Sequence, residues 1–485
     1  MYSLLPVVAI LGFMVMAFSL IMGVPLAFAW FGNEASPLDH LMAMAITFAS
    51  GLAIWLATRR FKRELQPRDG FLLVAGVWSV LPAFATLPLL LHVPHMSFTD
   101  AYFETMSGIT TTGSTVMTGL DALPLSVNVW RCLLTFLGGM GLIVMAVAIL
   151  PMLGVGGSQM FRAETPGPMK DTKLTPRIAE TARGLWTVYV SIAVACTLAY
   201  RAAGMGWADA FMHMCTTIAL GGFSSYDASF GAFNSPAIEA VAIVFMLIAG
   251  INFALYFMVW RRRSLRSVWR DAEARAFFGV LAFGVLAVWL VLMVQEVYPS
   301  PWVSLRHAAF SVVSVATTTG FVTVDYSAWP LFAPALMMLL ACFATSAGST
   351  GGGIKMARAL LLFKQARREL VRIVHPRAVH PVRMGGGIVD NNVLFAVLAF
   401  MLIYGATTIV LTMVMLASGL DLVTAASAVV ASVNNLGPGL GSVGPAGNFQ
   451  GLSDFQTWVC TIAMLMGRVE LLSILVLFTP QFWQK

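Results

Sequence analysis

Four short polar loops, each built around a glycine, are the residues best suited to bind an ion in this very hydrophobic chain. The first reads TTTGST (110–115), and a similar sequence, TTTGF, returns at 317–321. Related loops carry ALGGFSS (219–225) and NNLGPG (434–439). Threonine hydroxyls and backbone carbonyls can replace the hydration shell of a monovalent cation, and glycine allows the positive φ that turns neighbouring carbonyls the same way.

The loops recur with a regular spacing and in the same context. Aligned on one glycine each, they lie 109, 98 and 117 residues apart; the aligned residues are Gly113, Gly222, Gly320 and Gly437. Thirteen residues before each glycine stands a polar residue: Asp100, Asp209, His307 or Thr424. Aspartate and threonine are typical of a helix N-terminus. Because thirteen helical residues rise only about 20 Å, each short helix is predicted to enter the membrane and turn back.

Composition identifies the class of protein that must position these loops. The chain has 485 residues, of which 59% are hydrophobic and 11% charged. Apolar windows of about 20 residues, each able to cross roughly 30 Å of hydrocarbon, recur along nearly its whole length. The sequence therefore predicts an all-α polytopic membrane protein, and the apolar N-terminal segment is too long for a signal peptide.

The repeats divide the chain into an N-terminal hairpin at 1–68 and four units at 69–180, 181–270, 271–385 and 386–485. The hairpin has spans at about 3–30 and 38–58. Each unit contains an apolar span, a short helix, a polar loop and a second apolar span. We predict the first spans near 71–93, 182–204, 276–297 and 388–418. We predict the second spans near 125–156, 236–260, 329–362 and 453–479.

Charge distribution gives the expected orientation. Most of the 29 lysines and arginines lie in four linkers, at 59–68, 158–183, 261–275 and 355–383. By the positive-inside rule these linkers, and both termini, are expected on the cytoplasmic side. The repeats are then parallel to one another, which favours four units around one axis. Basic linkers without a nucleic-acid motif do not indicate nucleic-acid binding, although they can contact anionic lipid.

The physics of the bilayer restricts what four such loops can do. Non-helical backbone at membrane depth is tolerated only when it is buried in protein or lines a water-filled path. The short helices are expected to point their partially negative C-terminal ends toward the membrane centre. Carbonyls and hydroxyls gathered in that field favour a dehydrated monovalent cation, so we expect an ion filter.

A second polar segment interrupts the last span of the third unit. It reads TSAGSTGGGIK (345–355), and so many glycines are unfavourable in a helix. At this depth we expect it to line a cavity; the alternative is a glycine-rich helix contact. Its candidate residues are Thr345, Ser346, Gly348, Ser349, Gly351, Gly352 and Gly353.

Arg468 lies too deep in the last span to reach the surface easily, and an ionisable residue within a membrane is a functional candidate. The alternative is an arginine bound to carbonyls for structure alone. Glu470 is expected on another helix face and not as its partner. Glu104, Arg131, Arg201 and Arg306 are predicted mainly as structural charges, and His213 and His307 as packed residues.

Other classes of function are less well supported. A membrane-embedded enzyme needs paired carboxylates, a histidine cluster or a nucleophile with its base, and we recognise none in the sequence. The five cysteines are scattered in apolar stretches without metal-ligand spacing. A transporter with alternating access is typically built from inverted repeats, whereas these repeats are parallel.

The motifs resemble the Trk/Ktr/HKT superfamily of potassium uptake proteins, and in particular its TrkH type, over essentially the whole chain. The similar segments include SGITTTGST, AETPGPMKDTKLTPRIAETA, GGFSSYDAS, AGSTGGGIKMAR and NNLGPGLG. The resemblance implies an N-terminal hairpin followed by four M1–P–M2 repeats around a single pore, like a potassium channel folded from one chain.

The resemblance also implies roles for individual residues. Carbonyls of the two residues before each aligned glycine are expected to bind K⁺: Thr111, Thr112, Leu220, Gly221, Thr318, Thr319, Asn435 and Leu436. Units two and four depart from TTTG, so we expect weaker K⁺/Na⁺ discrimination than in a fourfold symmetric filter. The loop at 345–354 is expected to act as a gate, with Arg468 facing the pore beneath the filter.

Further expectations concern the biological setting. The resemblance implies potassium uptake across a bacterial inner membrane, a homodimer, and a cytoplasmic nucleotide-binding ring subunit of TrkA type. It implies K⁺ as the transported ion and no organic cofactor. A symporter that couples K⁺ to H⁺ or Na⁺ on the same fold stays open as the alternative to a gated channel.

Overall fold

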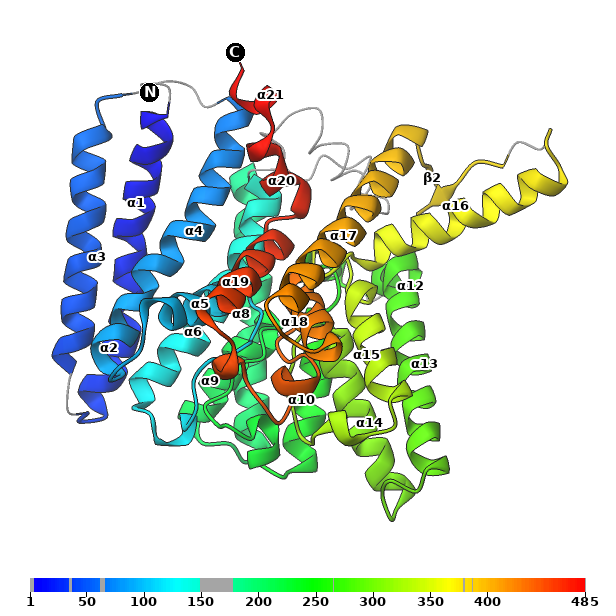
Figure 1. Ribbon diagram of the computed structural model, residues 1–485, viewed down its shortest axis with the longest axis horizontal. Coiled ribbons are helices and arrows are strands. Elements are labelled where there is room, and N and C mark those ends of the chain that lie inside the picture. The colour runs from blue at the N-terminus through cyan, green and yellow to red at the C-terminus, as the bar shows by residue number, and fades with distance from the viewer. Residues whose placement is uncertain are drawn as a thin grey trace.

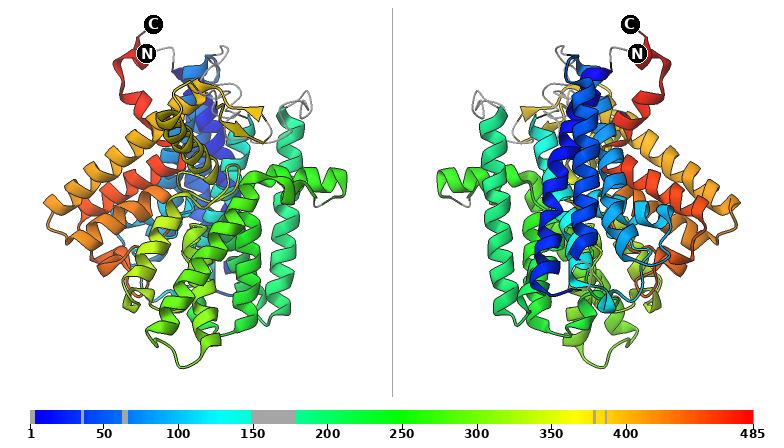
Figure 2. Two further views of the ribbon diagram at one scale, coloured as in Figure 1. Left: turned by 90° about the vertical axis from the view of Figure 1, so that its right-hand side faces the viewer. Right: turned by 90° about the vertical axis from the view of Figure 1, so that its left-hand side faces the viewer.

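The computed structural model describes residues 4–34, 37–61, 66–148, 178–264, 266–377, 380–385 and 387–484. It confirms an all-α membrane protein: apart from one two-residue hairpin, β1 (Arg383–Met384) and β2 (Gly387–Ile388), the regular elements of these residues are helices. Six described helices are long and apolar enough to cross a membrane, or up to eight if each of two bent pairs is one span. The start of α1 and the C-terminal α21 (Pro480–Trp483) lie at the same end of the molecule (Figure 2).

The N-terminal hairpin consists of α1 (Leu5–Ile21), α2 (Gly23–Phe31) and α3 (Pro37–Thr58). Glycines let α1 and α3 approach closely: a Cβ at Gly51 would lie 2.8 Å from the carbonyl oxygen of Gly12. Such small-residue contacts are typical of helices that pack within a bilayer. The span predicted near 3–30 is confirmed as one apolar segment, Leu5–Phe31, although a turn at Met22 divides it into α1 and α2.

Each of the four units begins with a long helix followed by a short one (Figure 1). The long helices are α4 (Pro67–His92), α8 (Ile178–Ala202), α13 (Ala272–Val294) and α17 (Asn391–Ala417). The short helices are α5 (Phe98–Ile109), α9 (Trp207–Ala219), α14 (Pro301–Ala316) and α18 (Leu422–Asn434). Asp100, Asp209 and Thr424 lie in the first turn of their helices, as predicted, and Thr424 N donates to the side chain of the N-cap residue Asp421. In unit three the prediction is wrong, because α14 begins at Pro301, six residues before His307.

The second spans differ from one unit to the next. Unit one has α6 (Leu125–Ala148), and the rest of the span predicted to residue 156 lies outside the described residues. In unit two α10 (Pro236–Ala249) bends by 89° into α11 (Phe253–Arg262), and α12 (Arg266–Arg270) follows. In unit three α15 (Phe332–Phe343) and α16 (Met356–Val374) flank the glycine-rich segment. In unit four α19 (Asp454–Arg468) bends by 111° into α20 (Leu471–Leu475) and the turn after it.

The segments predicted as spans at 236–260 and 453–479 are therefore each divided by a sharp bend, which the sequence did not predict. In unit two the backbone groups freed by the break find partners in the glycine-rich segment. Gly250 O accepts from Ser346 N at 3.0 Å, and Phe253 N donates to Gly348 O at 3.0 Å. In unit four Glu470 takes a positive φ of 66° at the bend. Contacts between distant segments, rather than local sequence, stabilise these breaks.

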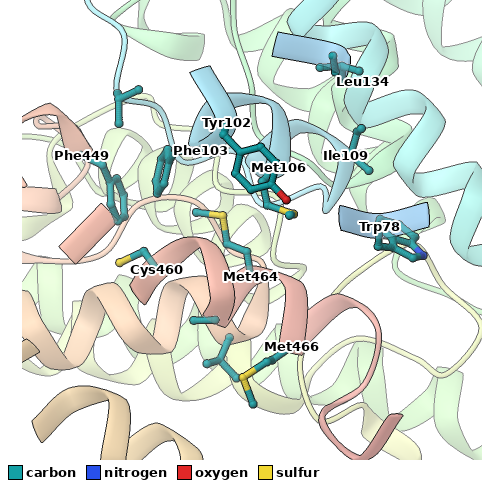
Figure 3. Packing of buried hydrophobic residues seen from close by; sticks show 14 of the residues in the cluster. Trp78, Tyr102, Phe103, Met106, Ile109, Leu134, Phe449, Cys460, Met464 and Met466 are labelled. Atoms are coloured by element: carbon teal, nitrogen blue, oxygen red, sulfur yellow. The ribbon is translucent and has the colours of Figure 1, made fainter. Parts of the chain in front are cut away.

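Hydrophobic side chains join the last unit to the first. Phe103 of α5 lies beside Phe449, with ring centroids 5.4 Å apart, and Met464 of α19 approaches Met106 of α5 (Figure 3). Tyr102 likewise packs against Trp458, at 5.2 Å. Buried aromatic pairs of this kind add to the free energy gained by apolar burial, so the cluster holds the short helix of unit one against the second span of unit four.

Candidate ion pathway

The four short helices end with the same hydrogen-bond pattern. In each unit the residue just before the aligned glycine donates its N–H to the carbonyl five residues earlier. The four bonds are Thr112 to Ser107 at 2.8 Å, Gly221 to Thr216 at 2.8 Å, Thr319 to Ser314 at 2.9 Å and Leu436 to Ala431 at 2.9 Å. In each unit the preceding residue also donates its N–H to the carbonyl three residues before it. These two bonds together are the Schellman ending of a helix.

The backbone also repeats in its φ angles. The residue two before each glycine is left-handed, with φ of 54° at Thr111, 53° at Leu220, 59° at Thr318 and 53° at Asn435. The glycines follow at 84°, 64°, 82° and 103°. A left-handed non-glycine residue costs on the order of 1–3 kcal/mol. Four unlike side chains thus accept the same strained conformation, which indicates that the site is built from backbone.

Glycine is required in these loops because it permits a positive φ and because neighbouring loops approach too closely to leave room for a side chain. A Cβ built at Gly113 would overlap the carbonyl oxygen of Gly221 in the second unit. One at Gly222 would overlap that of Thr319, and one at Gly320 that of Leu436.

The last contact closes the circle: a Cβ at Gly437 would lie 3.0 Å from the carbonyl oxygen of Thr112 in the first unit. Ser114 adds a hydrogen bond across this junction, to Gly437 O at 2.8 Å. Each loop therefore contacts the next, and the four form a closed ring that we call the glycine ring (residues 111–113, 220–222, 318–320 and 435–437).

The predicted ligand residues all lie in this ring and are all buried. Their N–H groups are used at the helix ends, as described above. Among the hydrogen bonds of the described residues, Gly221 O accepts one from Phe223 N at 2.9 Å, while the other seven predicted carbonyls accept none. These carbonyl oxygens keep lone pairs for a cation, near four converging helix C-termini whose partial charge is negative.

Side chains support the ring in different ways. In units one and three, hydroxyls pair: Thr110 with Thr112 at 2.8 Å and Thr317 with Thr319 at 2.7 Å. In unit four the amide of Asn435 donates to Thr112 Oγ1 and to Met464 O, both at 3.0 Å. Leu220 and Leu436 instead pack into hydrophobic clusters. The departures from TTTG therefore change the supports of the ring and leave its backbone path unchanged.

A buried ion pair holds the chain segments that follow Gly113 and Gly222. Glu104 accepts from Arg131 Nε at 2.8 Å, from Val116 N at 3.0 Å and from Thr115 Oγ1 at 2.9 Å. Arg131 also donates to Ser224 O at 3.1 Å, which joins the loops of units one and two. These charges are structural, as predicted.

Two other predicted structural residues have similar roles. Arg306 makes a two-point pair with Glu239, at 2.7 and 2.6 Å, between units two and three. His213 is packed, and its ring nitrogens contact Asp209 O at 2.9 Å and Ser224 Oγ at 3.0 Å.

The glycine-rich segment, which we call the cross-loop (residues 345–355), is non-helical as predicted and lies against the helix ends that carry the ring. Gly352 N donates to Thr318 Oγ1 at 2.8 Å, and Thr350 Oγ1 donates to Ile218 O at 2.9 Å. A Cβ at Gly352 would overlap the carbonyl oxygen of Asn434. The cross-loop thus contacts units two and four as well as its own unit.

Arg468 connects the cross-loop to the remaining unit. It is 3% exposed, and it donates to Thr350 O at 2.9 Å and to Gly138 O of α6 at 3.1 Å. Arg468 therefore binds carbonyls, as the structural alternative predicted, but one of them belongs to the cross-loop. Glu470 does not pair with it and instead bonds Arg358 of α16 at 2.9 Å.

Two residues of this region were missed in the sequence. Glu273, 1% exposed near the start of α13, accepts at one carboxylate oxygen from Ala347 N at 2.6 Å and from Ala357 N at 3.1 Å. Asn252 caps α11 and lies against Gly348. Glu273 lies in DAEAR, at the end of the basic linker 261–275, and that charged context gives no signal of its buried position.

The chain is similar in sequence and in structure to known proteins. A family model described as TrkH, cation transport protein, matches residues 39–485. The Trk system potassium uptake protein TrkH of Escherichia coli K12 is 46% identical over 98% of both chains, and that of Halomonas elongata is 44% identical over the full length of both. The crystal structure of the potassium transporter TrkH from Vibrio parahaemolyticus superposes with a TM-score of 0.91, at 41% identity and 99% coverage of both chains.

Proposed function

The chain belongs to the TrkH family of cation transport proteins, and from that premise we propose that it takes up K⁺ across the bacterial inner membrane through the glycine ring. The observation that carries the proposal is the ring itself. Four loops of different sequence share one backbone conformation and contact one another in the order one, two, three, four, one. Oxygen ligands from four equivalent chain segments are the arrangement that coordinates a dehydrated K⁺.

In this proposal the cross-loop and Arg468 form the gate. The cross-loop lies against the ring-bearing helix ends and is bonded to all four units, directly or through Arg468. A cation that has passed the ring then meets both the packed cross-loop and a buried guanidinium, which raises its electrostatic energy. Flux requires this segment to move, so the proposed pore is gated rather than always open.

The names of the relatives, Trk system proteins, support a complex with further subunits. We propose that a nucleotide-binding ring subunit of TrkA type binds the cytoplasmic face, and that the chain forms a homodimer. The exposed α16, which extends away from the helical bundle (Figure 1), directly follows the cross-loop. A partner bound to α16 would therefore act on the proposed gate through a continuous helix.

The test is uptake of ⁸⁶Rb⁺ into liposomes that contain the purified protein and hold an outwardly directed K⁺ gradient. Uptake driven by that gradient alone, and lost in Gly113→Asp, is expected for a gated channel. Uptake only when a proton or sodium gradient is added would support the symporter instead. Equal uptake by wild type and Gly113→Asp would contradict the ring as the ion path.

A further inference from the structure

A cluster of metal-ligating side chains lies outside the proposed ion path, at the end of the molecule opposite the termini (Figure 1). Glu34 follows α2, His40 lies in the first turn of α3, and His92 is the last residue of α4. One potential ligand atom from each lies within 4.8 Å of the others. Asp39 borders the cluster, with Oδ2 3.5 Å from His92 Nδ1.

The hydrogen bonds of His40 leave one of its nitrogens without a partner. Ser126 Oγ donates its single proton to the Glu34 carboxylate, which can only accept. In the hydrogen bond of 2.9 Å between His40 Nε2 and Ser126 Oγ, the imidazole N–H must then be the donor and the hydroxyl oxygen the acceptor. Nδ1 of a neutral His40 is therefore a bare lone pair on a side chain that is 0% exposed, and it has no partner within the described residues.

His92 repeats the situation beside it. Its Nδ1 also makes no hydrogen bond to a described residue, and its ring stacks on that of His40 with centroids 4.8 Å apart. A buried polar atom without a partner is costly, and two such imidazole nitrogens next to a carboxylate are the ligand set that Zn²⁺ and similar divalent ions prefer. The hydrogen bond from His40 to Ser126 is the kind of outer contact that orients a metal-bound histidine.

We propose that Glu34, His40 and His92 form a binding site for a divalent transition-metal ion of the zinc type on the outer face, with Asp39 available as a fourth ligand. Ligand atoms of a tetrahedral zinc site lie about 3.3 Å apart, given Zn–N bonds near 2.0–2.1 Å. The ligand atoms, which now lie within 4.8 Å of one another, would therefore move closer together when the ion binds. The bound ion would tie α3 to α4 and, through Ser126, to the start of α6.

The experiment measures Zn²⁺ binding by calorimetry to the full-length protein, purified with a tag that contains no histidine and stripped with EDTA. One ion per chain is expected, together with a rise in the melting temperature that zinc causes by binding the native state. His40→Ala or His92→Asn is expected to weaken binding at least about tenfold, and Ser126→Ala by about tenfold, as for other outer-shell partners. Co²⁺ in place of Zn²⁺ should give the visible absorption of a tetrahedral ion.

His95→Asn is the matched control, because His95 is exposed three residues after His92 and outside the cluster. It should bind zinc like the wild type. The proposal is overturned if the wild type binds no more zinc than a His40→Ala/His92→Asn double variant, or if His95→Asn loses binding equally. His92→Asn, which keeps a polar side chain of similar size, carries the test if replacement of the fully buried His40 prevents folding.

Discussion

The glycine ring and the cross-loop region below it are built from the same four repeats but differ in symmetry. In the ring, Thr111, Leu220, Thr318 and Asn435 share one left-handed backbone conformation. Beneath it the four second spans take different courses: α6 shows no break up to Ala148, and the other three are broken in three different ways. An ion site needs equivalent ligands around its axis, whereas a gate needs one segment able to move relative to the rest.

The largest effect on ⁸⁶Rb⁺ uptake is expected from substitutions of the ring glycines. Gly222→Ala and Gly320→Ala would each force a methyl group into a carbonyl oxygen of the next unit, at a left-handed position that alanine also disfavours. We expect ⁸⁶Rb⁺ uptake to be abolished in both. Gly437→Ala, where the nearest carbonyl is 3.0 Å away, should retain more uptake than either.

Gly405→Ala is the matched control for this series, since a Cβ there would meet no atom within 4 Å. It should transport like the wild type. If Gly320→Ala transports at the wild-type rate in a folded protein, the close packing of the ring is not required for flux.

The next largest effect is expected at the contact between the two regions. Arg468→Gln removes the charge and weakens the bonds to Thr350 O and Gly138 O. Hydrogen bonds to charged groups contribute about 1.5–3 kcal/mol each, so loss of one should shift a closed cross-loop toward open and raise ⁸⁶Rb⁺ flux by roughly tenfold. Arg201→Gln removes an equal charge far from the cross-loop and should leave flux unchanged. Lower or unchanged flux in folded Arg468→Gln would refute its role in the gate.

A smaller increase is expected for Glu273→Ala. Its carboxylate accepts from Ala347 N in the cross-loop and from Ala357 N in the first turn of α16, which directly follows the cross-loop. Loss of these two bonds should favour the open arrangement. Glu273→Gln keeps an oxygen that can accept these bonds, so its flux should lie between the wild type and Glu273→Ala. Equal flux in all three proteins would show that this anchor does not control the gate.

The smallest effect is expected at the side chains in which the loops differ. Leu436→Thr makes the fourth loop more like the first and third, but the ring is formed by backbone and Leu436 packs in a hydrophobic cluster. We expect most K⁺ uptake to remain, with some loss of thermal stability from the buried hydroxyl. A large gain in K⁺ over Na⁺ selectivity in competition assays would instead show that the side chains set discrimination.

The symmetric region was predictable from sequence and the asymmetric region only in part. Glycine spacing located all four loops, since a turn at membrane depth needs these residues in any unit. The cross-loop was equally visible in its run of glycines. The breaks near Asn252 and Glu470 were not, because they depend on hydrogen bonds to segments far away in the chain. The partners of Arg468 and Glu273 are likewise set by tertiary packing, which no local pattern records.

The most direct measurement of the central claim is the position of Rb⁺ in crystals of the protein grown in rubidium salt, read from anomalous scattering. The account predicts peaks within coordination distance of the carbonyl oxygens of the glycine ring, with ligands from all four units. Peaks found only elsewhere, or a ring in which Rb⁺ contacts one or two units, would contradict it.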